Sequence, residues 1–261
     1  MTPSEASAVP YVQLIRAPNP GPTTLDGTNT WVIADQRDGA LVVDPGPAIE
    51  AHIEAILAAC TPRLATIVLT HRHLDHSEAA AMLAERAGCG VRAADPQFRI
   101  GPDGLDGGQL IKLGALSLEV FETPGHTSDS RSLLLAGPDG VSRLITGDMV
   151  LGRGTTVITY PDGDLAAYFD SLDLLERLVS TRNVVELLPG HGPTVTDPLP
   201  WLSFYRSHRH QRLDEIRAAL AAGDRTAAEI VARVYADVDR SVWPAAEQSV
   251  RAQLDYLHQQ G

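Results

Sequence analysis

The segment THRHLDHSEAA, residues 70–80, places three histidines and one aspartate within six positions, from His71 to His76. The chain has nine histidines in 261 residues, and at that frequency the pattern H-x-H-x-D-H arises by chance in roughly one chain per thousand of this length. Neutral imidazole is the commonest metal ligand, whereas clustered protonated histidines repel one another. The segment therefore predicts a metal site rather than a histidine-rich loop without a ligand.

The residues on either side of this cluster indicate a loop between a strand and a helix. LATIVLT before the cluster is typical of a buried strand, and Ser77 followed by EAAAMLAE is typical of a helix with Ser77 as its N-cap. In an extended segment, positions 71, 73 and 75 project to the same side. We therefore expect the cluster on a strand-to-helix loop, where functional groups gather in α/β folds.

Three later segments each combine an apolar strand, a glycine turn and one ligand-type side chain. They are FETPGHTSDS with His126, LITGDMVLG with Asp148 and VELLPGHGP with His191. A single histidine after Pro-Gly is more often a turn residue, but the combination with the cluster favours metal ligands. Four ligands close a tetrahedral site, so further ligands imply two metal ions. The spacing predicts one cluster and does not assign its members to particular ions.

Short runs rich in Val, Ile and Leu, bounded by Gly, Pro or Asp, predict strands. We expect them at residues 11–16, 30–34, 40–44, 65–70, 108–113, 116–121, 132–136, 143–147 and 184–188. Helical patterns cover residues 49–59, 77–87 and 165–179, and three further helices follow residue 198, with breaks at Gly223 and Trp243–Pro244. The pattern predicts an α/β catalytic domain, residues 1–197, and a helical appendage, residues 198–261.

Composition and charge narrow the expected partners and location. The formal net charge of −12 disfavours double-stranded nucleic acid. No run approaches the roughly 20 apolar residues needed to cross a bilayer, so we expect no membrane association. MTPSEASAVPYVQLIRAPNP lacks the basic region and apolar core of a secretory signal, which favours a cytoplasmic location. Cys60 and Cys89, each near a predicted helix end, are expected to be reduced.

The order His71-x-His73-x-Asp75-His76, then His126, Asp148 and His191, resembles the metallo-β-lactamase superfamily of hydrolases over roughly residues 10–195. The resemblance implies an αββα sandwich of four layers, with two sheets packed face to face and helices outside. It also implies that His71, His73 and His126 hold one metal ion. Asp75, His76 and His191 would hold a second ion, and Asp148 would bridge the two.

An aspartate at the bridging position, where the best-known zinc β-lactamases have cysteine, is similar to the glyoxalase II, ribonuclease Z and phosphodiesterase branches. GTNTWVI, GDMVLGRGTTVI and YFDSLDLLERL resemble the β-lactamase-like protein 2 subgroup, in which the C-terminal appendage is a winged-helix-like module. This chain has no obvious β-wing after residue 198. The resemblance implies a hydrolase whose relatives act on single-stranded RNA or thioesters. The lack of a secretory signal, together with aspartate in place of cysteine at the bridging position, argues against a secreted antibiotic-degrading enzyme.

These residues predict a dinuclear metal-dependent hydrolase that uses a metal-bridging hydroxide to cleave a small ester or thioester. Asp75 is both a predicted ligand and the expected proton acceptor from the bridging water. Zn²⁺ suits the ligands, and Mn²⁺ or Fe²⁺ is compatible with them. Thr155, Thr156 and Tyr160 in GRGTTVITYPDG are candidates for substrate contact, although an ordinary connecting loop fits that segment equally well.

Two alternatives stay open at this point. An endoribonuclease for single-stranded RNA needs cationic walls and stacking aromatic residues, whereas aromatic residues make up only 5% of this chain. A non-catalytic metal-binding interaction module would need only one closed metal site. In FYRSHRHQRLDEIR, residues 204–217, the basic residues fit a solvated helix face better than a guide for phosphate. In GTNTW, Asn29 and Thr30 fit either a support for the site or a plain hairpin turn.

Overall fold

The computed structural model describes residues 9–260. Residues 1–8, which begin the segment that we interpret as lacking a secretory signal, and Gly261, the predicted end of the appendage, lie outside the described residues. Within residues 9–260, no helix has the length and hydrophobicity needed to cross a membrane. Cys60 and Cys89 are both free, as predicted.

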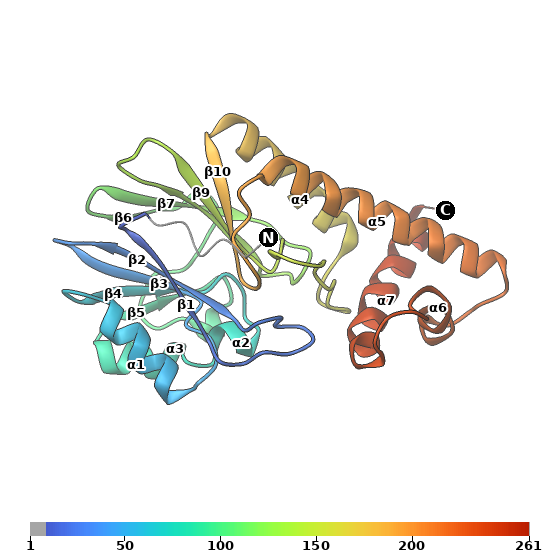
Figure 1. Cartoon of the computed structure of the whole chain (residues 1–261), viewed down its shortest axis with the longest axis horizontal. Coiled ribbons are helices and arrows are strands. Elements are labelled where there is room, and N and C mark those ends of the chain that lie inside the picture. Colours follow the sequence, from blue (N-terminus) through green and yellow to red (C-terminus); the bar gives the residue numbers. More distant parts are fainter. Residues whose placement is uncertain (1–8, 261) are drawn as a thin grey trace.

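Within residues 9–260, ten strands form two mixed sheets of five strands each (Figure 1). The first sheet has the order β1 (Val12–Arg16), β2 (Asn29–Asp35), β3 (Gly39–Val43), β4 (Leu64–Val68) and β5 (Gly90–Arg92). The second has the order β10 (Val184–Pro189), β9 (Ser142–Gly147), β8 (Arg131–Ala136), β7 (Leu116–Glu122) and β6 (Leu110–Leu113). Nine of the ten strands are predicted from sequence. The three-residue β5 is not, because it is too short to show an alternating pattern.

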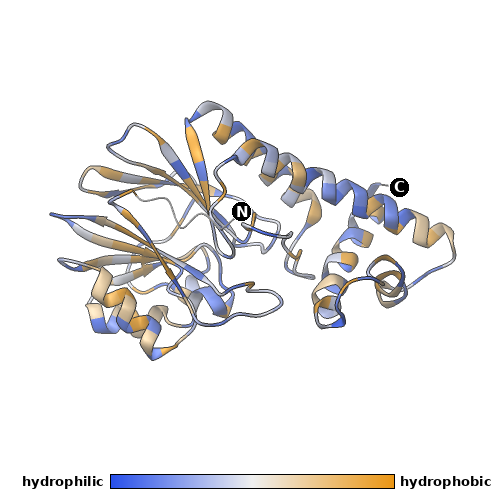
Figure 2. Cartoon of the chain, in the orientation of Figure 1, coloured by the Kyte–Doolittle hydropathy of each residue, from blue (hydrophilic) through white to orange (hydrophobic). Residues whose placement is uncertain are grey.

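Three clusters of buried hydrophobic residues lie between the layers of the fold. Between the sheets, Ile33 and Leu41 of the first pack with Leu118 and Leu133 of the second. The outer face of the first sheet is covered by α1 (Glu50–Ala59) and α3 (Ala80–Ala87). The outer face of the second is covered by α4 (Leu165–Thr181) and α5 (Pro198–Ala221). Figure 2 shows hydrophobic residues along the strands of both sheets, as burial on both faces requires. The predicted αββα sandwich is confirmed.

The C-terminal segment consists of helices and, within residues 198–260, contains no strand. After α5 come α6 (Ala227–Val234), the short 3₁₀ helix η2 (Arg240–Val242) and α7 (Trp243–Gln260). A capping box of Thr226 and Glu229 begins α6. Ile216, Ile230 and Val250 join the three helices in a small core of their own. The predicted helical appendage is present, while the limit at residue 197 stays a prediction because α5 also packs on α4.

Candidate metal centre

The histidine-rich segment follows β4 and turns directly into the one-turn helix α2 (Leu74–Ser77). The His73 carbonyl accepts the backbone N–H groups of His76, at 2.9 Å, and Ser77, at 3.0 Å. Asp75 and His76 therefore lie on a helix, and the prediction that positions 71, 73 and 75 share one extended segment is wrong. Ser77 as an N-cap is also wrong, since its hydroxyl donates to the Arg72 carbonyl at 3.0 Å and α3 begins only after Ala79.

The other predicted ligands all lie at one edge of the second sheet. His126 follows β7, Asp148 follows β9 and His191 follows β10. Strands β7 and β9 are both antiparallel to β8, and β10 is parallel to β9, so β7, β9 and β10 run in the same direction. Their carboxyl ends consequently meet at one edge, facing the loop after β4 of the first sheet.

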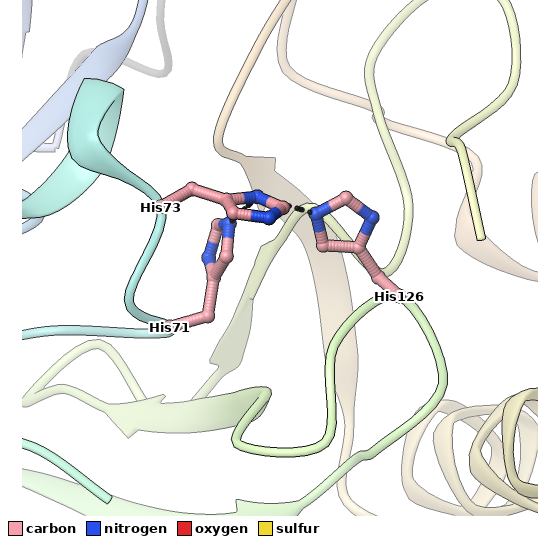
Figure 3. Close-up of side chains that lie close together, drawn as sticks. All are labelled: His71, His73 and His126. Carbon is pink, nitrogen blue, oxygen red and sulfur yellow. Dashed lines mark hydrogen bonds between the residues drawn. The ribbon is translucent and has the colours of Figure 1, made fainter. Parts of the chain in front are cut away.

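All seven predicted ligands converge on one place in the structure. They form three overlapping groups whose ligand-type atoms lie within 4.8 Å of one another: His71, His73 and His126; His71, His76 and Asp148; and Asp75, His76 and His191. Figure 3 shows the first group: His71 and His73 come from the loop after β4, His126 comes from the loop after β7, and the three rings lie close together. In it, Nδ1 of His73 lies 3.0 Å from Nε2 of both His71 and His126. In the third group, Nε2 of His191 lies 3.2 Å from Asp75 Oδ2 and from His76 Nε2.

Asp148 lies between the first and third groups. Its Oδ2 atom is 3.8 Å from His126 Nε2 and 3.4 Å from His191 Nε2. Its Oδ1 atom is 3.4 Å from His76 Nε2 and, within the described part of the chain, is buried without a hydrogen-bond partner. A carboxylate that reaches both groups with an unpartnered buried oxygen suits a ligand shared between two cations.

The outward-facing ring nitrogens show that this donor set fits metal ions. Nδ1 of His126 lies 2.6 Å from the Val157 carbonyl, and Nδ1 of His191 lies 3.3 Å from the Gly27 carbonyl. A carbonyl only accepts, so each Nδ1 carries a proton, and in the neutral ring each inward Nε2 then presents a lone pair. Inward ring nitrogens only 3.0–3.2 Å apart, beside carboxylates, share protons in the metal-free protein and are placed to bind a metal ion once they are deprotonated. The residues therefore fit divalent metal ions.

A second buried carboxylate, Asp44, orients two of the histidines from behind. Its Oδ2 atom lies 2.9 Å from His76 Nδ1 and accepts the Thr70 hydroxyl at 2.7 Å. That hydroxyl oxygen is in turn 3.1 Å from His71 Nδ1. Asp44 is only 1% exposed, so solvent does not compete for these contacts. Asp44 was not among the predicted site residues, although it follows the buried strand GALVV in the same way that Asp148 follows its strand.

Asn29 and Thr30 support the site rather than forming a plain turn. The Asn29 amide donates to the carbonyls of Pro189, at 3.0 Å, and Gly192, at 2.8 Å, which flank His191. The Thr30 hydroxyl donates to the Asp44 carbonyl at 2.7 Å. Both side chains thus hold the backbone of segments that carry site residues.

A cavity of about 580 Å³ opens from the cluster toward the C-terminal helices. His73, Asp75, His126 and Asp148 line its inner end. Thr155 and Thr156 line its side, whereas Tyr160 is absent from the lining and packs against the hydrophobic core. Of the three residues predicted to contact substrate, Thr155 and Thr156 therefore line this cavity and Tyr160 does not.

The C-terminal helices form the other wall of the cavity, through residues that include His208, Arg209, Arg212, Val238, Val242 and Ala246. The expectation that the basic residues of α5 form a solvated face is wrong for Arg209, which is only 2% exposed. Arg209 faces the loop after β9 and donates to the Thr156 carbonyl. Arg206 does pair at the surface, with Asp173 and Glu176. The difference lies in what each side chain meets: Arg206 lies beside α4, whereas Arg209, about one turn further along α5, meets the loop after β9.

Comparison with known families agrees with this geometry. Residues 23–232 match the family described as "Metallo-beta-lactamase superfamily", and residues 226–261 match the "Beta-lactamase associated winged helix domain".

The chain belongs to the metallo-β-lactamase superfamily.

Individual superfamily members show how far the likeness extends. The chain is 31% identical to the "Beta-lactamase-like protein 2 homolog" of Caenorhabditis elegans, over 93% of this chain and 82% of the relative. It is 27% identical to the "Atrochrysone carboxyl ACP thioesterase" of Aspergillus chevalieri, over 89% and 76% of the two chains. The crystal structure of a beta-lactamase domain protein from Burkholderia ambifaria, 24% identical, superposes with a TM-score of 0.81 and covers 98% of this chain and 88% of that one. The chain is thus a metallo-β-lactamase superfamily hydrolase with a His/Asp candidate metal site.

Burial and charge divide the histidines of this superfamily site into two kinds. Burial lowers the pKa of His126 to about 4 and lowers the pKa of His71 well below its usual value. Burial also lowers the pKa of His191, but the charges and hydrogen bonds of Asp148 and Asp75 outweigh it and raise the pKa to about 9. The same competition raises the pKa of His76 well above 6.5. Without metal, His76 and His191 therefore carry protons near neutral pH, whereas His71 and His126 are neutral.

We expect metal binding to release protons from this site. At pH 7.5, below the His191 pKa of about 9, His191 and His76 are protonated, and each must lose its proton before it can bind a metal ion. Calorimetric titrations of metal-free protein in buffers of different ionisation enthalpy should show release of about one to two protons. Apparent affinity should rise with pH and level off above about 9. Binding heats that are independent of the buffer at pH 7.5 would contradict this arrangement.

Asp44→Asn should weaken metal binding although Asp44 is not a predicted ligand. The amide keeps the shape but loses the negative charge that holds the Nδ1 proton of His76. Loss of such an outer partner typically costs about 10- to 100-fold in metal affinity. Competition with a chromophoric chelator measures the change, and Asp38→Asn, an exposed aspartate in the β2–β3 turn, is the matched control. Equal affinity of Asp44→Asn and the parent would show that Asp44 does not orient His76.

Proposed function

We propose that this protein hydrolyses a thioester or ester of a small acyl group, with two divalent metal ions held by the seven-residue cluster. His71, His73 and His126 would hold one ion, Asp75, His76 and His191 the other, and Asp148 both. The observation that carries the proposal is the cavity, which leads from Asp75 and Asp148 to an apolar wall at Val238 and Val242. Such a cavity suits a small, partly apolar substrate.

Bound divalent cations would supply a hydroxide near neutral pH and would stabilise negative charge that develops on the attacked carbonyl oxygen. The chain itself supplies a proton acceptor. Burial raises the pKa of Asp75, but His76 and His191 outweigh it and hold the pKa below the usual value. Asp75 is therefore ionised at neutral pH, and it lines the cavity with a side chain that is 31% exposed. Its carboxylate is placed to accept a proton during hydrolysis.

The relatives support a thioester over other acyl substrates. The Aspergillus chevalieri relative is named a carboxyl ACP thioesterase and is similar over 89% of this chain. The all-His/Asp donor set favours Zn²⁺ as the resident ion, while Mn²⁺ or Fe²⁺ suits the same ligands. A cytoplasmic location stays a prediction.

Cleavage of single-stranded RNA is the second candidate, because Arg153, Arg209 and Arg212 line the cavity. Against it, Tyr235 is the one aromatic residue other than histidine in this lining, and Arg212 lies 4.5 Å from the centre of its ring. Nucleic-acid channels bind successive bases by stacking on aromatic rings. The lining therefore favours a small thioester, and a closed, non-catalytic metal site is disfavoured because the cluster opens into the cavity.

A substrate panel tests the proposal. Metal-loaded protein is assayed with an acyl thioester of N-acetylcysteamine, bis-nitrophenyl phosphate, a short single-stranded RNA and a β-lactam. We expect the thioester to have the highest kcat/KM and Asp148→Ala to abolish its hydrolysis. If RNA is cleaved with the higher kcat/KM and Asp148→Ala abolishes that cleavage, the thioester proposal is wrong and the nuclease takes its place.

A further inference from the structure

Arg209 of α5 is a buried cation without a carboxylate partner. Its side chain is 2% exposed, and no Asp or Glu of residues 9–260 lies within ion-pair distance of it. One terminal nitrogen donates to the Thr156 carbonyl, and the guanidinium lies 5.1 Å from the centre of the Tyr168 ring. Its Nε atom is buried and unpartnered. Burial of a charge without an opposite charge is costly, so this position calls for an anion.

The neighbouring arginines differ from Arg209 because each has its own carboxylate. Arg212 pairs with Glu215 at 2.6 Å, and Arg153 pairs with Asp26 at 3.1 Å. Within the cavity lining, the acidic residues are Asp75 and Asp148, both of which belong to the metal cluster. The lining therefore holds one uncompensated cation, Arg209.

His208 places a second unused donor in the same wall. Its Nε2 atom accepts from Arg212 Nε at 3.4 Å, so the proton of the neutral ring is on Nδ1. That Nδ1 atom is buried and, in the described part of the chain, has no hydrogen-bond partner. His208 and Arg209 both line the cavity, where a ligand could satisfy both donors.

This wall is close to the predicted reaction centre. Thr156 contacts Arg209 through its carbonyl, and its hydroxyl oxygen lies 3.2 Å from His126 Nδ1. One residue thus separates Arg209 from a predicted metal ligand. An anion at Arg209 would share the cavity with a carbonyl bound at the cluster, and Val242 and Ala246 add apolar surface to the same lining.

We propose that Arg209 and His208 form a subsite for a carboxylate on the acyl part of the substrate, so that the preferred substrates are monothioesters of short dicarboxylic acids. The proposal rests on the proposed thioester hydrolysis and specifies its substrate class. A guanidinium–carboxylate contact of this kind contributes about 1.5–3 kcal/mol, which corresponds to a preference of about 10- to 100-fold.

Two matched N-acetylcysteamine thioesters test the subsite: the glutaryl thioester and its monoamide, in which CONH₂ replaces the distal carboxylate. After subtraction of spontaneous hydrolysis, the metal-loaded protein should show a kcat/KM about 10- to 100-fold higher for the glutaryl compound. Arg209→Met should abolish this preference. Ser249→Ala is the control, because the Ser249 hydroxyl accepts the Ile158 N–H and holds the same loop without a charge. Ser249→Ala should keep the ratio.

The outcomes separate the subsite from the catalytic proposal. Equal kcat/KM values for the two thioesters, or the same loss of preference in Ser249→Ala, would overturn the subsite while thioester hydrolysis stands. A preference for a phosphopantetheine over a pantetheine pentanoyl thioester that depends on Arg209 would place the anion on the thiol side and overturn the acyl assignment.

Calorimetry of the metal-loaded protein tests the subsite without turnover. Glutarate and its monoamide each offer one carboxylate to the metal ions, and only glutarate offers a second. Glutarate should bind at least about 10-fold more tightly, and only when Arg209 is present. If neither thioester is hydrolysed but glutarate shows this binding, the catalytic proposal fails and the anion subsite stands. Equal binding of the two acids would overturn the subsite.

Discussion

Asp148→Ala should lower kcat by about 10³-fold or more, because the charge stabilisation at a two-metal site is worth several kcal/mol. The change removes the carboxylate whose oxygens lie 3.4 Å from both His76 Nε2 and His191 Nε2 and 3.8 Å from His126 Nε2. It also removes the negative charge that two neighbouring cations would share. Metal content, measured by inductively coupled plasma mass spectrometry, should fall from about two ions per chain to one or fewer.

Asp170→Ala provides the control, because Asp170 is an exposed aspartate on α4, away from the cluster. It should keep both the metal content and the activity of the parent. Full metal content and activity in Asp148→Ala would show that the carboxylate shared by the two groups is not needed, and the two-metal account would fail.

Gly190→Ala should damage the site as severely as many ligand substitutions, although Gly190 has no side chain. A methyl group there would lie 2.7 Å from His76 Cε1 and still closer to Asp148 Oδ1, and contacts this short force both side chains to move. A displacement of about 1 Å in a catalytic group costs about 10²-fold in rate. We expect kcat to fall by about that factor, together with weaker metal binding.

Gly21→Ala is the control for adding a methyl group to a loop glycine. Its nearest neighbour would be the Thr24 hydroxyl oxygen at 3.1 Å, and Gly21 lies outside the residues that line the cavity. Its kcat and metal affinity should match those of the parent. Parent-like activity in Gly190→Ala would show that the positions of Asp148 and His76 tolerate displacement, contrary to the geometry described above.

The candidate ligand set could be predicted from the sequence because each candidate follows a local pattern. His126, Asp148 and His191 each close an apolar strand with a glycine turn, and strands that run the same way end at the same edge. The sandwich could be predicted for the same reason, since its strands are bounded by Gly, Pro or Asp. The local pattern gave a wrong prediction at Ser77, because the four-residue helix α2 is too short to show a helical periodicity in the sequence.

Residues that act through tertiary contacts could not be predicted from local sequence patterns. Asp44 is 26 residues from Thr70 and 32 from His76, so only the folded chain shows that it orients the cluster. Arg209 lies in a segment with many charges, and its burial depends on the loop after β9 packing against α5. A sequence pattern assigns a residue to a face of a helix, but not to the partner that the face meets.

The C-terminal helices consequently contribute residues to the candidate site. Arg209 of α5 donates to the Thr156 carbonyl, and Ser249 of α7 accepts the Ile158 N–H at 3.0 Å. Between these two anchors, the Val157 carbonyl accepts from His126 Nδ1 at 2.6 Å. The helices thus hold the loop that orients a predicted metal ligand.

Anomalous X-ray diffraction from crystals of the metal-loaded protein tests directly whether the seven side chains hold a pair of metal ions. We expect two anomalous peaks about 3.5–4 Å apart, one among His71, His73 and His126 and one among Asp75, His76 and His191, with Asp148 in contact with both. A single peak held by only one of the two groups, or no peak at the cluster in fully loaded protein, would contradict it.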